Sequence, residues 1–248
     1  VLYKYLDVTG AKAFLAKPQL RHTTFHELDD ICDSLPTFSQ LTADLSRQQA
    51  IQRAAQNPIE GISFQKQVRF YERLGMVSPS YLETIMRERI SQGHGYSTFI
   101  CSLVARPDSL AMWHQYGDGH RGIVFGIGSD LQRVITDKGR FLEKVIYPES
   151  NERPNTPFNN PSPAQIAHVF WTKGQDWSYQ EEWRIISDNP EIDLLGAGEI
   201  KEVIFGYRYS GDKSEIMKNP IFKDTKFFGA YPDPKYYRMV RLPLNSEE

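Results

Sequence analysis

The sequence lacks the short motifs by which many enzyme classes are recognised. It contains no glycine-rich phosphate loop, no nucleophile elbow, no His-Glu-x-x-His pair and no glycine fingerprint of the dinucleotide-binding type. These absences exclude assignments to kinases, P-loop proteins and Rossmann-type proteins. The two cysteines, Cys32 and Cys101, are too few in 248 residues for a disulfide scaffold or a cysteine-rich zinc site.

Long apolar runs and a large excess of one charge are also missing. No run approaches the roughly 20 apolar residues needed to cross a bilayer, and the first residues show no signal-peptide pattern. We therefore expect a cytoplasmic protein without membrane contact, with a secreted effector that has no cleaved signal as the alternative. The formal net charge of -2 gives no overall attraction to phosphate backbones, and the sequence shows no strong basic patch.

The composition and patterning that remain are those of an ordinary globular protein. Hydrophobic residues make up 40% and charged residues 24% of the chain, which is enough apolar surface for one core. Runs of period two and of period 3.6 alternate, so we expect a single α+β domain over residues 1–248 with a helical insertion over residues 38–93. We predict strands at residues 1–6, 19–25, 96–104, 122–127, 141–147, 182–187, 200–206 and within 226–244, and shorter helices at residues 11–16, 109–116, 164–171 and 213–218.

The first candidate site is the segment 112–122, which holds two aromatic residues, two histidines and three glycines. Trp113 and Tyr116 lie three residues apart, so on a helix they share a face and could flank a planar ligand. The glycines let the backbone approach a ligand closely or turn sharply. The alternative interpretation is structural: the two aromatics belong to the core and His120 caps a turn.

The second candidate site is the segment 177–184. Strand alternation would place Gln180, Glu182 and Arg184 on one face. A Gln and a Glu two residues apart can grip adjacent hydroxyl groups, while the carboxylate stabilises nearby positive charge. The same spacing fits a structural ion pair of Glu182 with Arg184 or Lys173, and both interpretations stay open.

An acidic loop follows the second predicted strand. His22, His26, Asp29, Asp30 and Asp33 are possible metal ligands, but their spacing matches no standard ligand pattern. We therefore predict no metal site. A metal-dependent nuclease that uses the three aspartates is a third hypothesis for function.

The order of these segments resembles a widespread bacterial family of unknown function. The resemblance rests on Leu2-Tyr3-Lys4-Tyr5, Met112-Trp113-x-x-Tyr116, His120-x-Gly122, Trp177-x-Tyr179-x-x-Glu182-x-Arg184 and Val203-Ile204-Phe205-Gly206. It extends over most of the chain, from residue 2 to residue 206. The family label implies no activity.

A second resemblance is to ADP-ribosyltransferases, especially those that modify nucleic acids. Strand, helix and strand at the start, followed much later by a strand that carries Glu182, are similar to their split NAD-binding β core. The resemblance implies that NAD is a substrate and that a macromolecular acceptor, protein or nucleic acid, is modified, as in toxins or phage-defence effectors. It is also compatible with an immunity or regulatory protein as a partner.

The same resemblance implies roles for individual residues. Glu182 would be the catalytic carboxylate that stabilises the oxocarbenium-like state, and Gln180 would orient the acceptor. Lys4 would contact the phosphates of the cofactor, where these enzymes usually have Arg or His, and Trp113 or Tyr116 would stack on nicotinamide. The expected cofactor-binding residues are Tyr3, Lys4, His22, Trp113, Tyr116, His120 and Arg184.

A non-catalytic interpretation competes with this one. In it, the aromatic surface of Trp113, Tyr116 and Trp177 binds a nucleotide or a partner protein, and Glu182 has no chemical role. The two hypotheses differ in which residue matters most: the carboxylate in the enzyme, the aromatic rings in the binding module.

Overall fold

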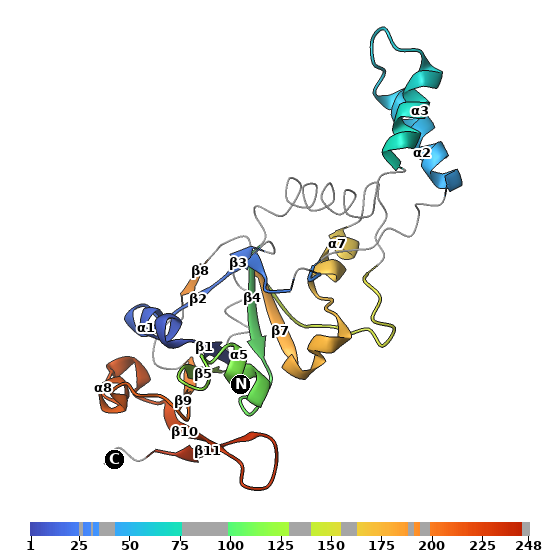
Figure 1. Cartoon of the computed structure of the whole chain (residues 1–248). Helices are drawn as coiled ribbons and strands as arrows, with labels where there is room; N and C mark the ends of the chain where they lie inside the picture. Colours follow the sequence, from blue (N-terminus) through green and yellow to red (C-terminus); the bar gives the residue numbers. More distant parts are fainter. Residues whose placement is uncertain are drawn as a thin grey trace.

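A computed structural model of the chain describes residues 1–24, 27–30, 32–34, 43–75, 99–128, 140–154, 163–187, 191–193 and 199–244. Within these residues the chain has a mixed α/β fold built on a mostly antiparallel sheet (Figure 1). The strands of the sheet, in spatial order, are β11 (Met239–Pro243), β10 (Lys226–Pro232), β9 (Ile200–Phe205), β5 (Ile123–Ile127), β1 (Leu2–Leu6), β4 (Phe99–Val104), β7 (Glu182–Ser187) and β6 (Phe141–Lys144), with β3 (Thr23–Thr24) paired to β4. The pair β9–β10 is parallel and the other pairs are antiparallel.

One face of this sheet is a large apolar core. Alternate strand residues such as Leu103, Phe125 and Phe205 are fully buried there. The face is covered by α1 (Val8–Ala16), α8 (Lys213–Met217), the 3₁₀ helix η4 (Pro220–Phe222), and β2 (Gln19–Arg21), which pairs with β8 (Glu191–Asp193) in a separate small sheet. The ring of Phe14 from α1 lies 4.2 Å from that of Phe125, which fixes the helix against the sheet.

The opposite face is apolar only in part. Tyr5, Val124 and Ile204 pack there with Met112 and Trp113 from α5 (Leu110–Gln115). Beyond β1 the apolar cover gives way to polar groups of β4 and β7, next to α7 (Pro163–Phe170) and the 3₁₀ helix η3 (Gln175–Gln180). This change from apolar to polar surface positions the candidate site.

The neighbouring strands β1 and β4 share fewer paired residues than the adjacent strand pairs of the sheet. Their described register consists of the single pair Tyr3 and Val104, whereas β1 and β5 are paired over five residues. Next to that pair, the Lys4 ammonium group donates to the backbone oxygen of Ser102 at 3.0 Å. A side chain thus supplies a hydrogen bond where the strands separate.

The expected helical insertion is represented by an antiparallel helix pair, α2 (Ala43–Gln56) and α3 (Phe64–Gly75). The buried Gln67 amide donates to the carbonyl oxygens of Ile59 and Ile62, at 3.0 and 2.7 Å, and so holds the connecting turn. On α2, Ala50 and Ala54 are buried, whereas Ile51 is 42% exposed. The remaining helical residues predicted at 38–42 and 76–93 lie outside the described part of the chain.

The other predicted strands and helices are found close to their expected bounds. Ser109 caps α5, since its hydroxyl accepts from the backbone N–H of Met112. The helix expected at residues 11–16 begins earlier, at Val8, because the Asp7 side chain caps it. Within the described residues no helix is both long and apolar enough to span a bilayer.

Candidate functional site

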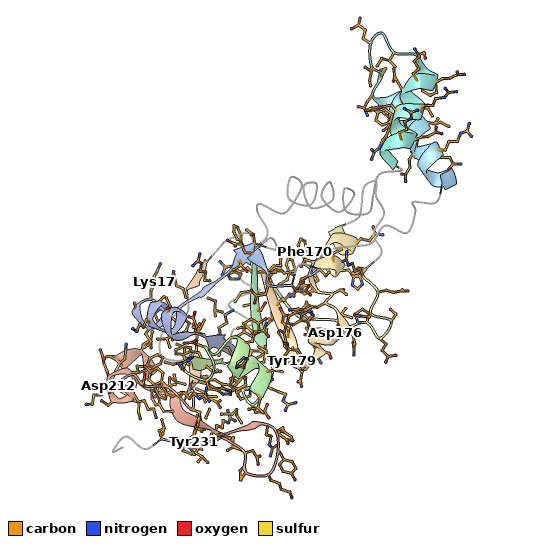
Figure 2. The ribbon with its side chains drawn as sticks, viewed as in Figure 1. Lys17, Phe170, Asp176, Tyr179, Asp212 and Tyr231 are labelled. Atoms are coloured by element: carbon orange, nitrogen blue, oxygen red, sulfur yellow. The ribbon has the colours of Figure 1, made fainter. Side chains whose placement is uncertain are left out.

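The polar region of the sheet opens into a cavity of about 190 Å³. Its walls come from β1, β4 and β7 on the sheet, from the end of α5 and from η3. The described residues of the acidic segment 27–33 close another side. The two aromatic segments singled out in the sequence therefore meet at one place, together with the acidic loop. Figure 2 shows the neighbourhood, with Phe170 of α7 and Asp176 and Tyr179 of η3 labelled.

The local backbone of the segment 177–184 differs from the predicted strand. Residues up to Gln180 form η3, Glu181 adopts a left-handed conformation with φ 46°, and β7 begins at Glu182. The prediction that Gln180 lies on a strand face was therefore wrong. The left-handed conformation of Glu181 nevertheless leaves the Gln180 side chain beside that of Glu182. Both side chains accept hydrogen bonds from the Lys173 ammonium, at 2.9 and 3.1 Å.

A buried network of four charges forms the floor of the site. Glu182 and Arg184 are 2% and 0% exposed, and the Arg184 Nε lies 2.7 Å from Glu182 Oε1. Asp33 joins from the acidic loop, 2.5 Å from Arg184 Nη2 and 3.4 Å from Lys173 Nζ. Two cations thus face two carboxylates, and the ion pairs that the sequence suggested for Glu182 are confirmed.

The guanidinium of Arg184 is engaged on all sides. Its Nη1 donates to Asp33 Oδ1 at 2.8 Å and to the carbonyl oxygen of Phe170 at 2.7 Å, and its Nε and Nη2 reach Glu182. A planar guanidinium held in this way fixes the carboxylates that it contacts. Arg184 is not among the residues that line the cavity, so it holds Glu182 in place rather than facing a ligand.

Burial and the two cations act in opposite directions on Glu182. Burial raises the pKa of its carboxyl group, but the charges of Arg184 and Lys173 outweigh this effect and lower the pKa to about 2. For Arg184, burial lowers the pKa, and the carboxylates of Glu182 and Asp33 raise it above its usual value. The wall of the cavity therefore carries a carboxylate that stays ionised at neutral pH.

Two tyrosines hold the backbone and the amide next to this carboxylate. The Tyr116 hydroxyl accepts from Gln180 Nε2 at 3.2 Å, and the Tyr147 hydroxyl accepts from the backbone N–H of Glu182 at 3.1 Å. Burial raises the pKa of both phenols, so both stay protonated at neutral pH. Tyr147 was not among the predicted site residues, since nothing in the local sequence distinguishes it from other strand-end tyrosines.

Trp113 and His120 lie in the core and in a turn rather than in the cavity. Trp113 is fully buried, its Nε1 donates to Pro107 O at 2.8 Å, and Tyr5 packs edge-on against its ring at 5.3 Å. His120 stacks on Trp113 at 6.3 Å, in the turn between α5 and β5, with φ 71°. The interpretation of Trp113 as a core residue is confirmed. Of the predicted aromatic pair, only Tyr116 lines the cavity.

Of three further residues predicted to bind the cofactor, two line the cavity and one is not among its described lining residues. Tyr3 and Lys4, near the start of the chain, line the cavity. His22 is not among the described lining residues; it is buried, and its Nδ1 lies 3.1 Å from the Leu20 carbonyl oxygen.

The described residues of the acidic loop are engaged in other contacts or exposed. Asp33 is paired with Arg184 and Lys173, and Asp29 is exposed. Among the residues that the structure describes, no three His, Cys, Asp or Glu side chains come together as metal ligands. His26 lies outside the described residues.

Residues 112–185 match the model of a family described as "Protein of unknown function (DUF2971)". The matched segment runs from α5 into β7 and contains both aromatic segments, Lys173 and Glu182. No match to the chain was found among the curated proteins or among the solved structures. The family description assigns no activity, so the function is argued from the site.

Proposed function

We propose that the chain binds NAD at the Glu182 cavity, cleaves the bond between nicotinamide and ribose, and transfers ADP-ribose to a macromolecular acceptor. The observation that carries the proposal is the ionised Glu182 carboxylate, held by Lys173 and Arg184 on the cavity wall. As the C–N bond breaks, its electrons leave with neutral nicotinamide and positive charge develops on the ribose. An acceptor nucleophile then forms the new bond to the ribose carbon and loses a proton. A preorganised carboxylate stabilises such a transition state.

The charge of the cavity supports a cationic guest. Five carboxylates and two ammonium groups are among the lining residues: Glu27, Asp29, Asp30, Asp33 and Glu182 against Lys4 and Lys173. The nicotinamide ring of NAD carries a positive charge, and so does the ribose in the transition state. Lys173 and the Arg184 guanidinium behind the wall balance Asp33 and Glu182, so the excess negative charge comes from Glu27, Asp29 and Asp30 against Lys4. This excess favours the cationic end of the molecule over its phosphates.

The size of the cavity supports the same orientation. Its volume of about 190 Å³ is below the roughly 300–1,000 Å³ typical of sites that enclose a drug-sized ligand. In the proposed orientation the nicotinamide and its ribose occupy this space, and the rest of the dinucleotide extends outside. Tyr116 lines the cavity and offers an aromatic ring, and its hydroxyl fixes the Gln180 amide that is proposed to orient the acceptor.

The sharpest test is nicotinamide release by purified protein, with Glu182→Gln as the main variant. The amide keeps the shape of the side chain and removes its charge, so we expect release at least about 100-fold slower, as for the loss of one preorganised electrostatic group. Glu143→Gln is the matched control, because Glu143 is an exposed residue of β6 outside the cavity. Thermal unfolding confirms that each variant is folded.

A second variant covers the case in which Glu182→Gln does not fold. Asp29 is exposed at the cavity, so Asp29→Asn leaves the buried network intact. We expect it to raise KM for NAD several-fold with little change in kcat, since it weakens the attraction to the cationic ring. Wild-type protein that releases no nicotinamide with any tested acceptor would contradict the proposal.

One observation favours the non-catalytic binding module instead. Both oxygens of Glu182 already accept hydrogen bonds from Arg184 or Lys173, as in a structural ion pair. In that case NAD or a related nucleotide binds without turnover, and Glu182→Gln changes stability but not affinity. Trp177 lines the cavity and is only half-buried, so Trp177→Ala is the substitution that should weaken binding.

A further inference from the structure

A second, larger cavity of about 390 Å³ lies on the same face of the sheet as the first. Its floor is apolar and consists of the buried side chains of Ile204, Ala230 and Met239 from three neighbouring strands. Its charged lining residues are Arg106, Arg238, Arg241 and Asp108. Three guanidinium groups and one carboxylate thus surround an apolar floor, a combination that suits an anion attached to an apolar or aromatic body.

The three arginines remain exposed to solvent although each has a carboxylate partner. Their side chains are 53%, 50% and 41% exposed for Arg106, Arg238 and Arg241. The partner carboxylates are less exposed than the arginines, at 26%, 7% and 13% for Asp108, Asp233 and Glu202, so a ligand phosphate would bind beside these ion pairs rather than replace them.

Two of the arginines also keep unused donors. Among the described contacts, Arg238 donates through Nε alone, to Asp233, and Arg241 donates through Nη1 alone, to Tyr3 and Glu202. The other N–H groups of each fork can therefore reach a ligand phosphate, which a guanidinium binds through two parallel hydrogen bonds.

The two cavities have no lining residue in common, but contacts between their lining residues connect them. Tyr3 lines the first cavity, while its hydroxyl accepts from Arg241 of the second at 3.0 Å. Val104 and Arg106 lie two residues apart, roughly 7 Å along an extended chain, and line one cavity each. Arg106 also pairs with Glu181 at 3.2 Å, between Gln180 and Glu182 of the first site.

We propose that the arginine cavity binds the diphosphate end of a nucleotide whose cationic end occupies the acidic cavity. This inference rests on the proposed function and specifies how NAD lies: nicotinamide ribose at Glu182, and ADP at Arg106, Arg238 and Arg241. The pairing of an acidic with an arginine-lined cavity matches the charge distribution of NAD, a cationic ring joined to an anionic diphosphate. The apolar floor beside the arginines accommodates the sugar or base.

The test uses ADP as the probe, because ADP contains the anionic end and cannot undergo the reaction. Calorimetric titration of the full chain should show ADP binding that weakens at least tenfold in Arg238→Gln and weakens as salt is raised. Arg241→Lys keeps the charge but loses the planar fork, so an intermediate loss is expected. Lys235→Gln is the matched control, since Lys235 is an exposed cation of the same hairpin that does not line the cavity.

A second probe separates phosphate chemistry from recognition of the whole nucleotide. Inorganic pyrophosphate should compete with ADP, but more weakly, because it makes no contact with the apolar floor. ADP binding that is absent from wild type, or equal in wild type and Arg238→Gln, overturns the inference.

The result is independent of the outcome for catalysis. If nicotinamide is released and Arg238→Gln leaves KM for NAD unchanged, the arginine site is wrong and the proposed function stands. If ADP binds in an Arg238-dependent way but wild-type protein releases no nicotinamide, the arginine site stands and the proposed function is wrong.

Discussion

At the scale of single residues, Arg184 accounts for the arrangement of the candidate site. Removing a guanidinium from water is costly, and the fully buried Arg184 is tolerated because its donors all find acceptors, including Glu182, Asp33 and the Phe170 carbonyl. Lys173 balances the second negative charge. Each charge in this network is balanced by another member, so the loss of one member leaves a buried, uncompensated charge.

Because the charges balance one another, removing the guanidinium should destabilise the protein strongly. We expect Arg184→Met to lower the free energy of unfolding by about 3–5 kcal/mol, because two buried carboxylates then share only Lys173. Urea unfolding measures the change. Arg121→Met is the matched control: the Arg121–Asp118 pair is 3.4 Å long and exposed, and its loss should cost less than about 1 kcal/mol. Equal losses of unfolding free energy in the two variants would show that the buried network stabilises the protein no more than an exposed ion pair does.

Individual residues also show how far sequence reasoning reaches. Glu182, Arg184 and Lys173 are close in sequence, so their pairing could be predicted from local spacing. Asp33 is 151 residues from Arg184, and an acidic loop residue gives no sign of the distant guanidinium that it will meet. The burial of Trp113 follows from its contacts with Tyr5 and Pro107, neither of which the motif around it reveals.

At the scale of elements, the junction from α5 to β5 depends on a close approach of backbones. A Cβ atom at Gly122 would lie 2.1 Å from the carbonyl oxygen of Leu6, at the end of β1. The backbone N–H of Gly122 donates to Gly117 O, and its own carbonyl oxygen accepts from Gly206. The glycine therefore lets three segments meet where β5 enters the sheet.

This contact predicts that Gly122→Ala destabilises the protein by about 3 kcal/mol, the upper end of overpacking effects, because the clashing atom is backbone and cannot rotate away. Chemical denaturation measures the loss. Gly61→Ala serves as the comparison: Gly61 has φ 79° but nothing within 4 Å of a new Cβ, so only a conformational cost of about 1 kcal/mol applies. A Gly122→Ala protein as stable as Gly61→Ala would rule out the close approach.

Elements with clear periodicity could be predicted, and those governed by one unusual residue could not. The strands β5 and β7 were predicted within one residue of their observed bounds, since β-branched and aromatic residues cluster there. Gln180, the last residue of the 3₁₀ helix η3, was wrongly placed on the face of β7. The left-handed conformation of Glu181 separates the two, and that conformation is rare for a glutamate and has no sequence signal.

At the scale of the whole molecule, net charge conceals how charge is distributed. A formal charge of -2 and the absence of a strong basic patch gave no indication of attraction to phosphate backbones. The fold nevertheless brings Arg106 from the loop after β4 to Arg238 and Arg241 at the β10–β11 hairpin. It also concentrates carboxylates in the neighbouring cavity. Such a separation depends on contacts between distant segments, so composition could not reveal it.

The stability of the whole chain should depend on pH through Glu182. Its carboxyl pKa falls from an ordinary 4.5 to about 2 on folding, so between these values the unfolded chain binds more protons. The stabilisation is complete above pH 4.5 and is lost as the pH falls toward 2. At about 1.4 kcal/mol per pKa unit it amounts to about 3 kcal/mol.

Urea unfolding of wild type and Glu182→Gln at several values between pH 7 and pH 2.5 isolates this contribution. The variant is expected to be less stable at pH 7 and to lose less stability on acidification, because the titrating group is gone. Parallel curves for the two proteins would assign the acid sensitivity to other carboxylates and would show that folding does not lower the pKa of the Glu182 carboxyl group.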